Sequence, residues 1–206
     1  YKRFIECLEH FNLRYKILGM NNKKFSMENT GGGFKIRLLK DYLLKDEVSE
    51  DTLIIFTDCF DVIFNDNGKN IIDKYNRIIN KEGCILFSTE VNCWPDLKLS
   101  KEYPEVETKY KYLNSGGFMG YKCDILKLLD VNIDELEDDQ LYYTKKFLEN
   151  KNIKLDYNCE IFQTLNNSVE DIKINIDRSE IINTYTKTKP SIIHGNGPSK
   201  LNCYDV

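Results

Sequence analysis

The sequence lacks several features that would mark particular classes of protein. None of its seven cysteines lies in a CxxC pair, so their spacing does not indicate a zinc site. No apolar run approaches the roughly 20 residues that a membrane-spanning helix needs. The 29 lysine and arginine residues are outnumbered by 33 acidic ones and form no basic stripe, which disfavours non-specific binding of nucleic acid. No signal peptide is visible at the start, so the ends of the chain do not indicate localisation.

Internal repeats, low-complexity tracts and Pro/Gly linkers are also absent, and 206 residues suit one large domain with a sizeable core. Helix-like and strand-like apolar patterns alternate along the chain, which predicts a single α/β layer structure. Helices are expected near residues 4–11, 34–43, 71–79, 125–129 and 141–148. Strands are expected near 15–18, 53–56, 84–88, 118–121, 161–162, 172–176 and 191–193.

The segment DTLIIFTDCFDVIF, residues 51–64, is the most informative part of the chain. Its apolar run indicates a buried strand that ends in two carboxylates, Asp58 and Asp61. Buried charge is costly unless it is paired, and ligands in open α/β sheets bind beyond the carboxyl ends of strands. A hard cation carrying a phosphate would fit there. An equally weighted alternative is that Asp58 caps a turn and Asp61 is solvated.

Histidine is scarce, with only His10 and His194 in the chain. A lone histidine is more often structural than a ligand. His194, however, follows a β-branched run and precedes the glycines of the HGNG segment, which permit close backbone approach to a ligand. Lys200 follows as a point charge suited to a phosphate. Together with Asp58 and Asp61, this imidazole would form a ligand set more typical of Mn²⁺ than of structural zinc.

Other polar clusters near expected strand ends are individually weak indications. Asp138 and Asp139 could simply complement a helix dipole. Trp94 could be an ordinary core or surface aromatic residue, and the NSGG segment at 114–117 predicts a turn. The glycine tract at 31–33 could cradle a phosphate, although it lacks the ending of a P-loop. The order of these clusters along the chain points to a common function.

That order resembles the glycosyltransferase domain of the multifunctional procollagen lysyl hydroxylases over nearly the whole chain. The resemblance implies an α/β fold of the GT-A (Rossmann-like) glycosyltransferase type, with a mixed central sheet flanked by helices. It also implies a single domain over residues 1–206, in which the first expected strand has no counterpart before Tyr1. The segments that carry the resemblance are TGGGFKIR (30–37), FTDCFDVIF (56–64), FSTEVNCWP (87–95), YPEVETKYKYLNSGGFMGY (103–121), DDQLYYT (138–144), IFQTLN (161–166) and HGNGPSKL (194–201).

By this resemblance, the domain is expected to use Mn²⁺ and to move glucose or galactose from a UDP-sugar to hydroxylysine or galactosyl-hydroxylysine of a collagen-like polypeptide. The same resemblance implies the lumen of the endoplasmic reticulum. The metal ligands are expected to be Asp58, Asp61 and His194. Residues expected around the nucleotide and diphosphate are Lys35, Phe60, Asn114, Gly195, Asn196, Gly197 and Lys200. Residues expected to face the donor sugar and acceptor, with catalytic roles, are Glu90, Trp94, Asp138 and Asp139.

Two positions depart from the family pattern. Phe60 stands where the family usually has Tyr, so it can stack on uracil but cannot donate a hydroxyl hydrogen bond. Leu38 replaces an aromatic residue near the donor pocket. Because of the Leu38 departure and the missing first strand, a non-catalytic domain that binds collagen or stabilises a larger protein is a second hypothesis. A haloacid-dehalogenase-type phosphatase is a third, although its two aspartates should be separated by one position, and Asp58 and Asp61 are farther apart.

Overall fold

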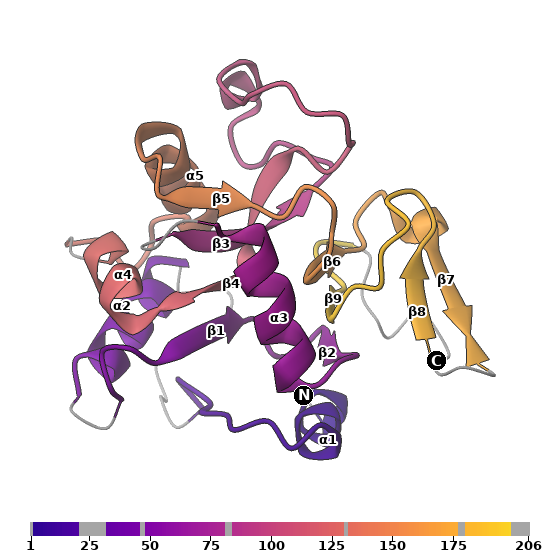
Figure 1. Ribbon diagram of the computed structural model, residues 1–206. Helices are drawn as coiled ribbons and strands as arrows, with labels where there is room; N and C mark the ends of the chain where they lie inside the picture. Colours follow the sequence, from indigo (N-terminus) through magenta and orange to yellow (C-terminus); the bar gives the residue numbers. More distant parts are fainter. Residues whose placement is uncertain are drawn as a thin grey trace.

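The computed structural model describes residues 2–20, 32–45, 48–80, 84–129, 132–176 and 180–198 (Figure 1). The helices are α1 (Lys2–His10), α2 (Gly32–Leu43), α3 (Gly68–Ile78), α4 (Lys122–Leu128) and α5 (Asp139–Glu149), with short 3₁₀ helices η1 (Leu97–Lys101) and η2 (Val169–Asp171). The strands are β1 (Leu53–Thr57), β2 (Val62–Phe64), β3 (Ile85–Glu90), β4 (Tyr112–Tyr121), β5 (Ile153–Leu155), β6 (Phe162–Thr164), β7 (Ile172–Asn175), β8 (Glu180–Asn183) and β9 (Ile192–His194).

The central sheet has four strands in the order β1-β4-β3-β5 and is mixed. Strand β4 pairs antiparallel with β1 and β3, whereas β3 and β5 are parallel. A second sheet has the order β2-β9-β6, and β7 and β8 form a separate antiparallel pair (Figure 1). The predicted α/β class, with a mixed central sheet between helices, is confirmed. Within the described ranges, no helix has the length and apolarity needed to cross a membrane.

Hydrophobic cores lie on both faces of the central sheet because successive strand residues point to opposite sides. Phe87 of β3 and Phe118 of β4 pack in one core with residues of α2, α4 and α5. Leu86 and Met119, their neighbours along the two strands, pack in the other core with residues of α1, α3 and the second sheet. The central sheet is therefore the middle layer of the domain.

Three sequence-based expectations differ from the structure. Residues 15–18 form no strand: although the segment has a β-like composition, it pairs with no strand among the described residues. The run at 53–57 is a strand, but it lies at the edge of the sheet with half-buried side chains. The NSGG segment is not a turn: it lies inside the ten-residue strand β4, where its small residues allow other side chains to pack against the backbone.

Candidate functional site

Three polar side chains from two distant segments meet beyond the end of β1. Asp58 follows β1 directly, and its backbone N–H donates to the carbonyl oxygen of Gly116 in β4 at 3.0 Å. Asp61 precedes β2, which pairs antiparallel with β9, the strand that ends at His194. The N–H of Gly195 donates to the carbonyl oxygen of Asp61 at 2.7 Å and fixes this register. The β2–β9 pairing thus brings His194 to the loop that carries Asp58 and Asp61, although the two segments are far apart in the sequence.

The distances from the imidazole to the two carboxylates are compatible with a shared cation. His194 Nε2 lies 3.5 Å from Asp61 Oδ1 and 3.8 Å from Asp58 Oδ2. Two ligands at about 2.1 Å from one ion lie about 3 Å apart at a right angle and farther apart at wider angles. Among the described residues, no group of three or more His, Cys, Asp or Glu side chains is placed so that it could hold a metal ion as the structure stands. The fit to a divalent cation therefore rests on the donor chemistry of two carboxylates and an imidazole.

A lysine places a positive charge beside these carboxylates. Lys35 of α2 has its Nζ 3.1 Å from Asp58 Oδ1 and 2.8 Å from Asp139 Oδ2 in α5. Burial alone would lower the pKa of Lys35, but the two carboxylates outweigh it and hold that pKa above its ordinary value. The ammonium group therefore stays charged and links α2, the end of β1 and α5.

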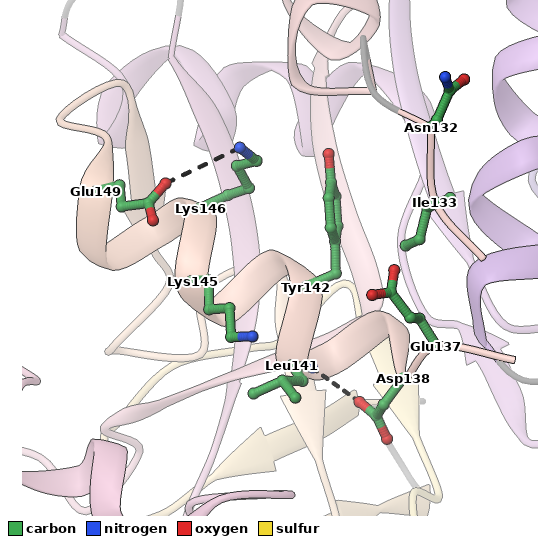
Figure 2. Close-up of a pocket in the computed structure, with 9 residues that line it drawn as sticks. All are labelled: Asn132, Ile133, Glu137, Asp138, Leu141, Tyr142, Lys145, Lys146 and Glu149. Atoms are coloured by element: carbon green, nitrogen blue, oxygen red, sulfur yellow. Dashed lines mark hydrogen bonds and ion pairs between the residues drawn. The ribbon is translucent and has the colours of Figure 1, made fainter.

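The two neighbouring aspartates at the start of α5 serve different parts of the molecule. Asp138 caps the helix, with its Oδ1 accepting the N–H of Leu141 at 2.8 Å. It also lines a cavity of about 300 Å³ on the same side of α5 as Lys145 (Figure 2). The candidate metal ligands do not line that cavity. Asp139 is the residue that reaches the metal-ligand candidates, through its ion pair with Lys35.

The glycines at the start of α2 allow this helix to approach the segment around Asp139. A Cβ atom on Gly32 would lie 2.0 Å from Asp139 Oδ1, so a larger residue would displace that carboxylate. The N–H of Gly33 donates to the carbonyl oxygen of Glu137 at 2.8 Å and is not available to a phosphate. Gly31, the first glycine of the tract, lies outside the described residues. The described part of the tract therefore serves helix packing.

Glu90, expected at the sugar, is buried beneath the site with 4% of its surface exposed. Its Oε1 accepts hydrogen bonds from Asn114 Nδ2 at 2.9 Å and Gln140 Nε2 at 2.7 Å. Its Oε2 accepts one from Asn196 Nδ2 at 3.3 Å. Burial raises the pKa of Glu90, while the amide donors act in the opposite direction. Side-chain amides from three separate chain segments therefore converge on one carboxylate.

Asn114 connects this buried cluster to His194. Its Oδ1 lies 3.2 Å from His194 Nδ1 and accepts the N–H of Gly116 at 3.1 Å. A Cβ atom on Gly116 would lie 2.2 Å from Cε1 of the imidazole, so the ring packs directly against the strand. The NSGG segment therefore fixes the position of the His194 ring, through the contact with Asn114 and the close approach to Gly116.

Gln140 is a site residue to which the sequence assigned no role, although it lies in the DDQLYYT segment. It is 7% exposed, donates to Glu90 and to the carbonyl oxygen of Trp94, and accepts the N–H of Ser115 at 3.2 Å. The available signal was periodicity: Gln140 lies three and four residues before the buried Tyr143 and Thr144, on one face of α5. An amide on a buried helical face requires hydrogen-bond partners.

The HGNG segment is ordered by its own contacts. Asn196 Oδ1 accepts the N–H groups of Leu165 and Asn166 at 3.1 and 2.9 Å. Gly197 has a φ of 61°, a conformation that L residues with a side chain rarely adopt. Lys200 lies outside the described residues.

Two large aromatic side chains at the site are exposed. Phe60, between Asp58 and Asp61, is 65% exposed, and Trp94 is 62% exposed. The structure therefore leaves both rings free to contact a flat ligand, whereas Phe87 and Phe118 of the central sheet are fully buried.

Comparisons with known proteins agree with this arrangement. Residues 1–205 match a family model described as the PLOD GT domain. The chain belongs to this family of glycosyltransferase domains. It is 39% identical over 211 residues to the "Multifunctional procollagen lysine hydroxylase and glycosyltransferase" of Caenorhabditis elegans, covering 97% of this chain and 29% of that protein. It is 35% identical over 212 residues to the human protein of the same name, LH3, covering 98% of this chain and 28% of that protein.

A viral protein is similar to this chain over nearly the same length. Protein R699 of Acanthamoeba polyphaga mimivirus is 39% identical over 202 residues, covering 96% of this chain and 43% of that protein. The chain thus spans less than half the length of these curated relatives. Family membership confirms the resemblance expected from the sequence, and the phosphatase hypothesis is wrong because the matched family is one of glycosyltransferase domains.

Solved structures with a similar arrangement are also glycosyltransferases. Mouse xyloside xylosyltransferase 1 has a TM-score of 0.49 at 15% identity, covering 81% of this chain and 64% of its own. The galactosyltransferase LgtC, in complex with donor and acceptor sugar analogs, has a TM-score of 0.48 at 14% identity, covering 89% and 63%. Since both scores are below 0.5, the family assignment of the PLOD GT domain rests on the sequence matches.

Proposed function

We propose that this PLOD GT domain is a Mn²⁺-dependent glycosyltransferase that moves glucose or galactose from a UDP-sugar to hydroxylysine or galactosyl-hydroxylysine of collagen-like polypeptides. The single observation that carries this proposal is the meeting of Asp58, Asp61 and His194 at the end of β1, with Lys35 and Asp139 beside them. The names of the relatives, which combine procollagen lysine hydroxylase with glycosyltransferase, support the acceptor and the reaction.

Asp58, Asp61 and His194 are the residues that would hold the cation. A bound divalent ion supplies positive charge at the diphosphate, where negative charge develops as the sugar leaves. The ammonium group of Lys35, 3.1 Å from Asp58, lies at the same side and adds a second positive charge for the phosphates. In this arrangement, the ammonium group of Lys35 and the candidate metal ligands would lie on the side of the leaving group.

The nucleotide would lie across the loop that joins β1 and β2. Phe60 presents an exposed ring between the two carboxylates, and such a ring stacks on a base without reading its hydrogen-bonding edge. The HGNG backbone, with Gly195 bonded to Asp61 and Gly197 at positive φ, would pass close to the diphosphate. Lys200 would contribute a further charge there.

The sugar and acceptor would lie between Asp139 and Trp94. Asp139 keeps its carboxylate at the site through Lys35 and would orient sugar hydroxyls or stabilise oxocarbenium-like charge. Asp138 would act by capping the helix that carries Asp139. The exposed ring of Trp94 would cover the sugar and exclude water. Glucose transfer to galactosyl-hydroxylysine retains configuration, whereas galactose transfer to hydroxylysine inverts it.

A donor and acceptor screen tests the proposal. UDP-glucose and UDP-galactose are each offered with collagen-like peptides that carry lysine, hydroxylysine or galactosyl-hydroxylysine, and UDP release is measured with and without Mn²⁺. One donor–acceptor pair is expected to turn over only with Mn²⁺. Asp61→Ala should abolish turnover, whereas Asp73→Ala, which alters an exposed carboxylate of α3, should not. Full activity of Asp61→Ala would show that the metal assignment is wrong.

The non-catalytic hypothesis makes the opposite prediction for the same reagents. A domain that only binds collagen-like chains would bind the peptides without turnover and would show no heat of binding for UDP with Mn²⁺ in calorimetry. The retained acidic and imidazole groups favour the enzymatic proposal, because a pure binding module has no need for them.

A further inference from the structure

Glu90 lies at the centre of a buried cluster in which the hydrogen bonds to its carboxylate all run in one direction, from side-chain amides to the carboxylate oxygens. The amide NH₂ groups of Asn114, Gln140 and Asn196 all point at its carboxylate. Each hydrogen bond that the structure records for this carboxylate, within the described residues, is one that it accepts. An ionised carboxylate has no proton to donate, so each amide turns its nitrogen toward Glu90 and its oxygen away.

The outward oxygens of two of these amides each order a backbone segment. Gln140 Oε1 accepts the N–H of Ser115 in β4. Asn196 Oδ1 accepts two consecutive N–H groups in the segment that follows β6. Reversing either amide would place N–H against N–H, which leaves buried donors unsatisfied. Because Glu90 holds the nitrogen of each amide, it also determines that the oxygens of Gln140 and Asn196 face these backbone N–H groups.

The third amide transmits the same polarity to His194. Because Asn114 Nδ2 is held by Glu90, Asn114 Oδ1 is the atom that lies 3.2 Å from His194 Nδ1. An oxygen acceptor at this position requires Nδ1 to carry the proton, which leaves Nε2 of the neutral ring with a free lone pair. Nε2 is the nitrogen that faces Asp58 and Asp61.

We propose that Glu90 is a positioning residue that acts through Asn114 to fix the tautomer of His194 and to present its Nε2 lone pair to a cation. The inference rests on the proposed metal site, but it gives Glu90 a role beneath the ligands instead of one at the sugar. The burial of the carboxylate and its engagement by three amides support this role. Groups that orient a metal-binding histidine typically change metal affinity 10–100-fold when they are altered.

The first test reads the tautomer directly in the metal-free protein. Long-range ¹H–¹⁵N correlation spectra distinguish an imidazole protonated at Nδ1 from one protonated at Nε2. The chain has two histidines, so a His10→Gln variant assigns the signals of His194. At pH 8 we expect a proton on Nδ1 and a bare Nε2. A neutral ring protonated at Nε2 in the wild-type protein would overturn the proposal.

The second test reverses the polarity of the cluster. Glu90→Gln keeps one acceptor oxygen and replaces the other with an NH₂ donor. Because Asn196 Oδ1 already accepts two backbone N–H groups, which hold its amide in place, we expect the remaining oxygen to face Asn196 and the new donor to face Asn114. Asn114 should then turn over, and the His194 proton should move to Nε2. We expect Mn²⁺ affinity, measured by electron paramagnetic resonance, to fall about 10–100-fold. Thr89→Val is the matched control: it removes a buried hydrogen bond to the Asp156 carbonyl at the neighbouring position of β3 and should change neither readout.

A third variant keeps the proposal testable if Glu90→Gln folds poorly. In Glu90→Gln/Asn114→Asp, the carboxylate is moved next to His194, where it accepts from the amide group introduced at position 90 and from Nδ1–H. This exchange should return the proton to Nδ1 and restore Mn²⁺ affinity above that of Glu90→Gln. A loss of affinity in Glu90→Gln without a tautomer change would overturn the proposal. Because the tautomer is read without metal or donor, failure to find transferase activity does not alter this result.

Discussion

Two buried carboxylates, Glu90 at the site and Asp156 between β5 and β6, differ in what holds them. Both are almost fully buried, at 4% and 3% exposure, and burial raises the pKa of both. Glu90 accepts from side-chain amides of three separate segments. Asp156 accepts backbone N–H groups from three consecutive residues, Glu160 to Phe162, at 2.7–2.9 Å.

The difference shows how a buried acid serves either a fold or a site. Backbone N–H groups cannot reverse, so Asp156 fixes the course of one loop and passes no further orientation on. Side-chain amides have two ends, so the carboxylate of Glu90 decides what each outward oxygen faces. We therefore expect changes around Asp156 to alter stability, and changes around Glu90 to alter binding.

The largest expected effect is a pH dependence of stability caused by Asp156. Burial raises its pKa from 3.8 to about 6 in the folded protein, against the opposing backbone hydrogen bonds. Between these two values the folded state binds more protons than the unfolded state, so the contribution of Asp156 to the free energy of unfolding falls as pH rises. The loss is of order 3 kcal/mol between about pH 4 and pH 6.

The measurement is urea unfolding of the wild type and of Asp156→Asn at several pH values, because the variant removes this titration and retains the others. The difference between the two free energies of unfolding should change across pH 4–6, as the wild type loses stability relative to the variant, and stay constant above pH 7. A difference independent of pH would contradict the account of Asp156. A change in Mn²⁺ affinity as large as that of Glu90→Gln would break the comparison of the two acids.

A smaller effect, on binding, is expected for Gly116→Ala. The added methyl group would meet the ring of His194 at 2.2 Å, so the imidazole must move away from the carboxylates. Affinity for Mn²⁺ with UDP should fall about tenfold in calorimetry. Gly120→Ala in the same strand is the control, since its Cβ would meet Ile85 at 3.1 Å and lies away from the site. Equal affinities for the two variants would show that ring position does not matter.

The smallest effect is expected for Lys35→Met. Its ammonium group lies 3.1 Å from Asp58 and repels a second cation, so removing it should raise the affinity for Mn²⁺ alone by about threefold at low salt. Lys69→Met, which alters an exposed ion pair on α3, should leave the affinity unchanged. If Lys35→Met bound Mn²⁺ more weakly, the lysine would help to build the cation site and would not compete with it.

The sequence predicted most of the helices and strands because their apolar periodicity matched their burial. It failed at NSGG because glycine and serine are common in turns, and only the sheet shows that Gly116 makes room for a ring from β9. The strand expected at 15–18 was wrong for a related reason: pairing depends on residues far along the chain.

The sequence predicted which residues belong to the candidate site better than it predicted how deeply each residue is buried. The apolar run that ends in Asp58 and Asp61, and the position of His194 before the glycines of HGNG, indicated a candidate metal site, and the family resemblance added the expected roles. Glu90 lies beneath the candidate ligands because β3 continues beyond its apolar residues, as a buried strand, to residue 90. The apolar pattern of the sequence does not show this continuation. Gln140 was given no role because an amide in a helix is ordinarily exposed, whereas this one is buried.

The most direct test of the central claim is a Mn²⁺ titration followed by electron paramagnetic resonance, with and without UDP, on the wild type, His194→Ala and His10→Ala. The account predicts one Mn²⁺ site per chain that binds more tightly with UDP. It also predicts an affinity at least about 100-fold weaker in His194→Ala and unchanged in His10→Ala. Equal Mn²⁺ binding by the wild type and His194→Ala would contradict the claim that β2–β9 pairing completes a cation site at the end of β1.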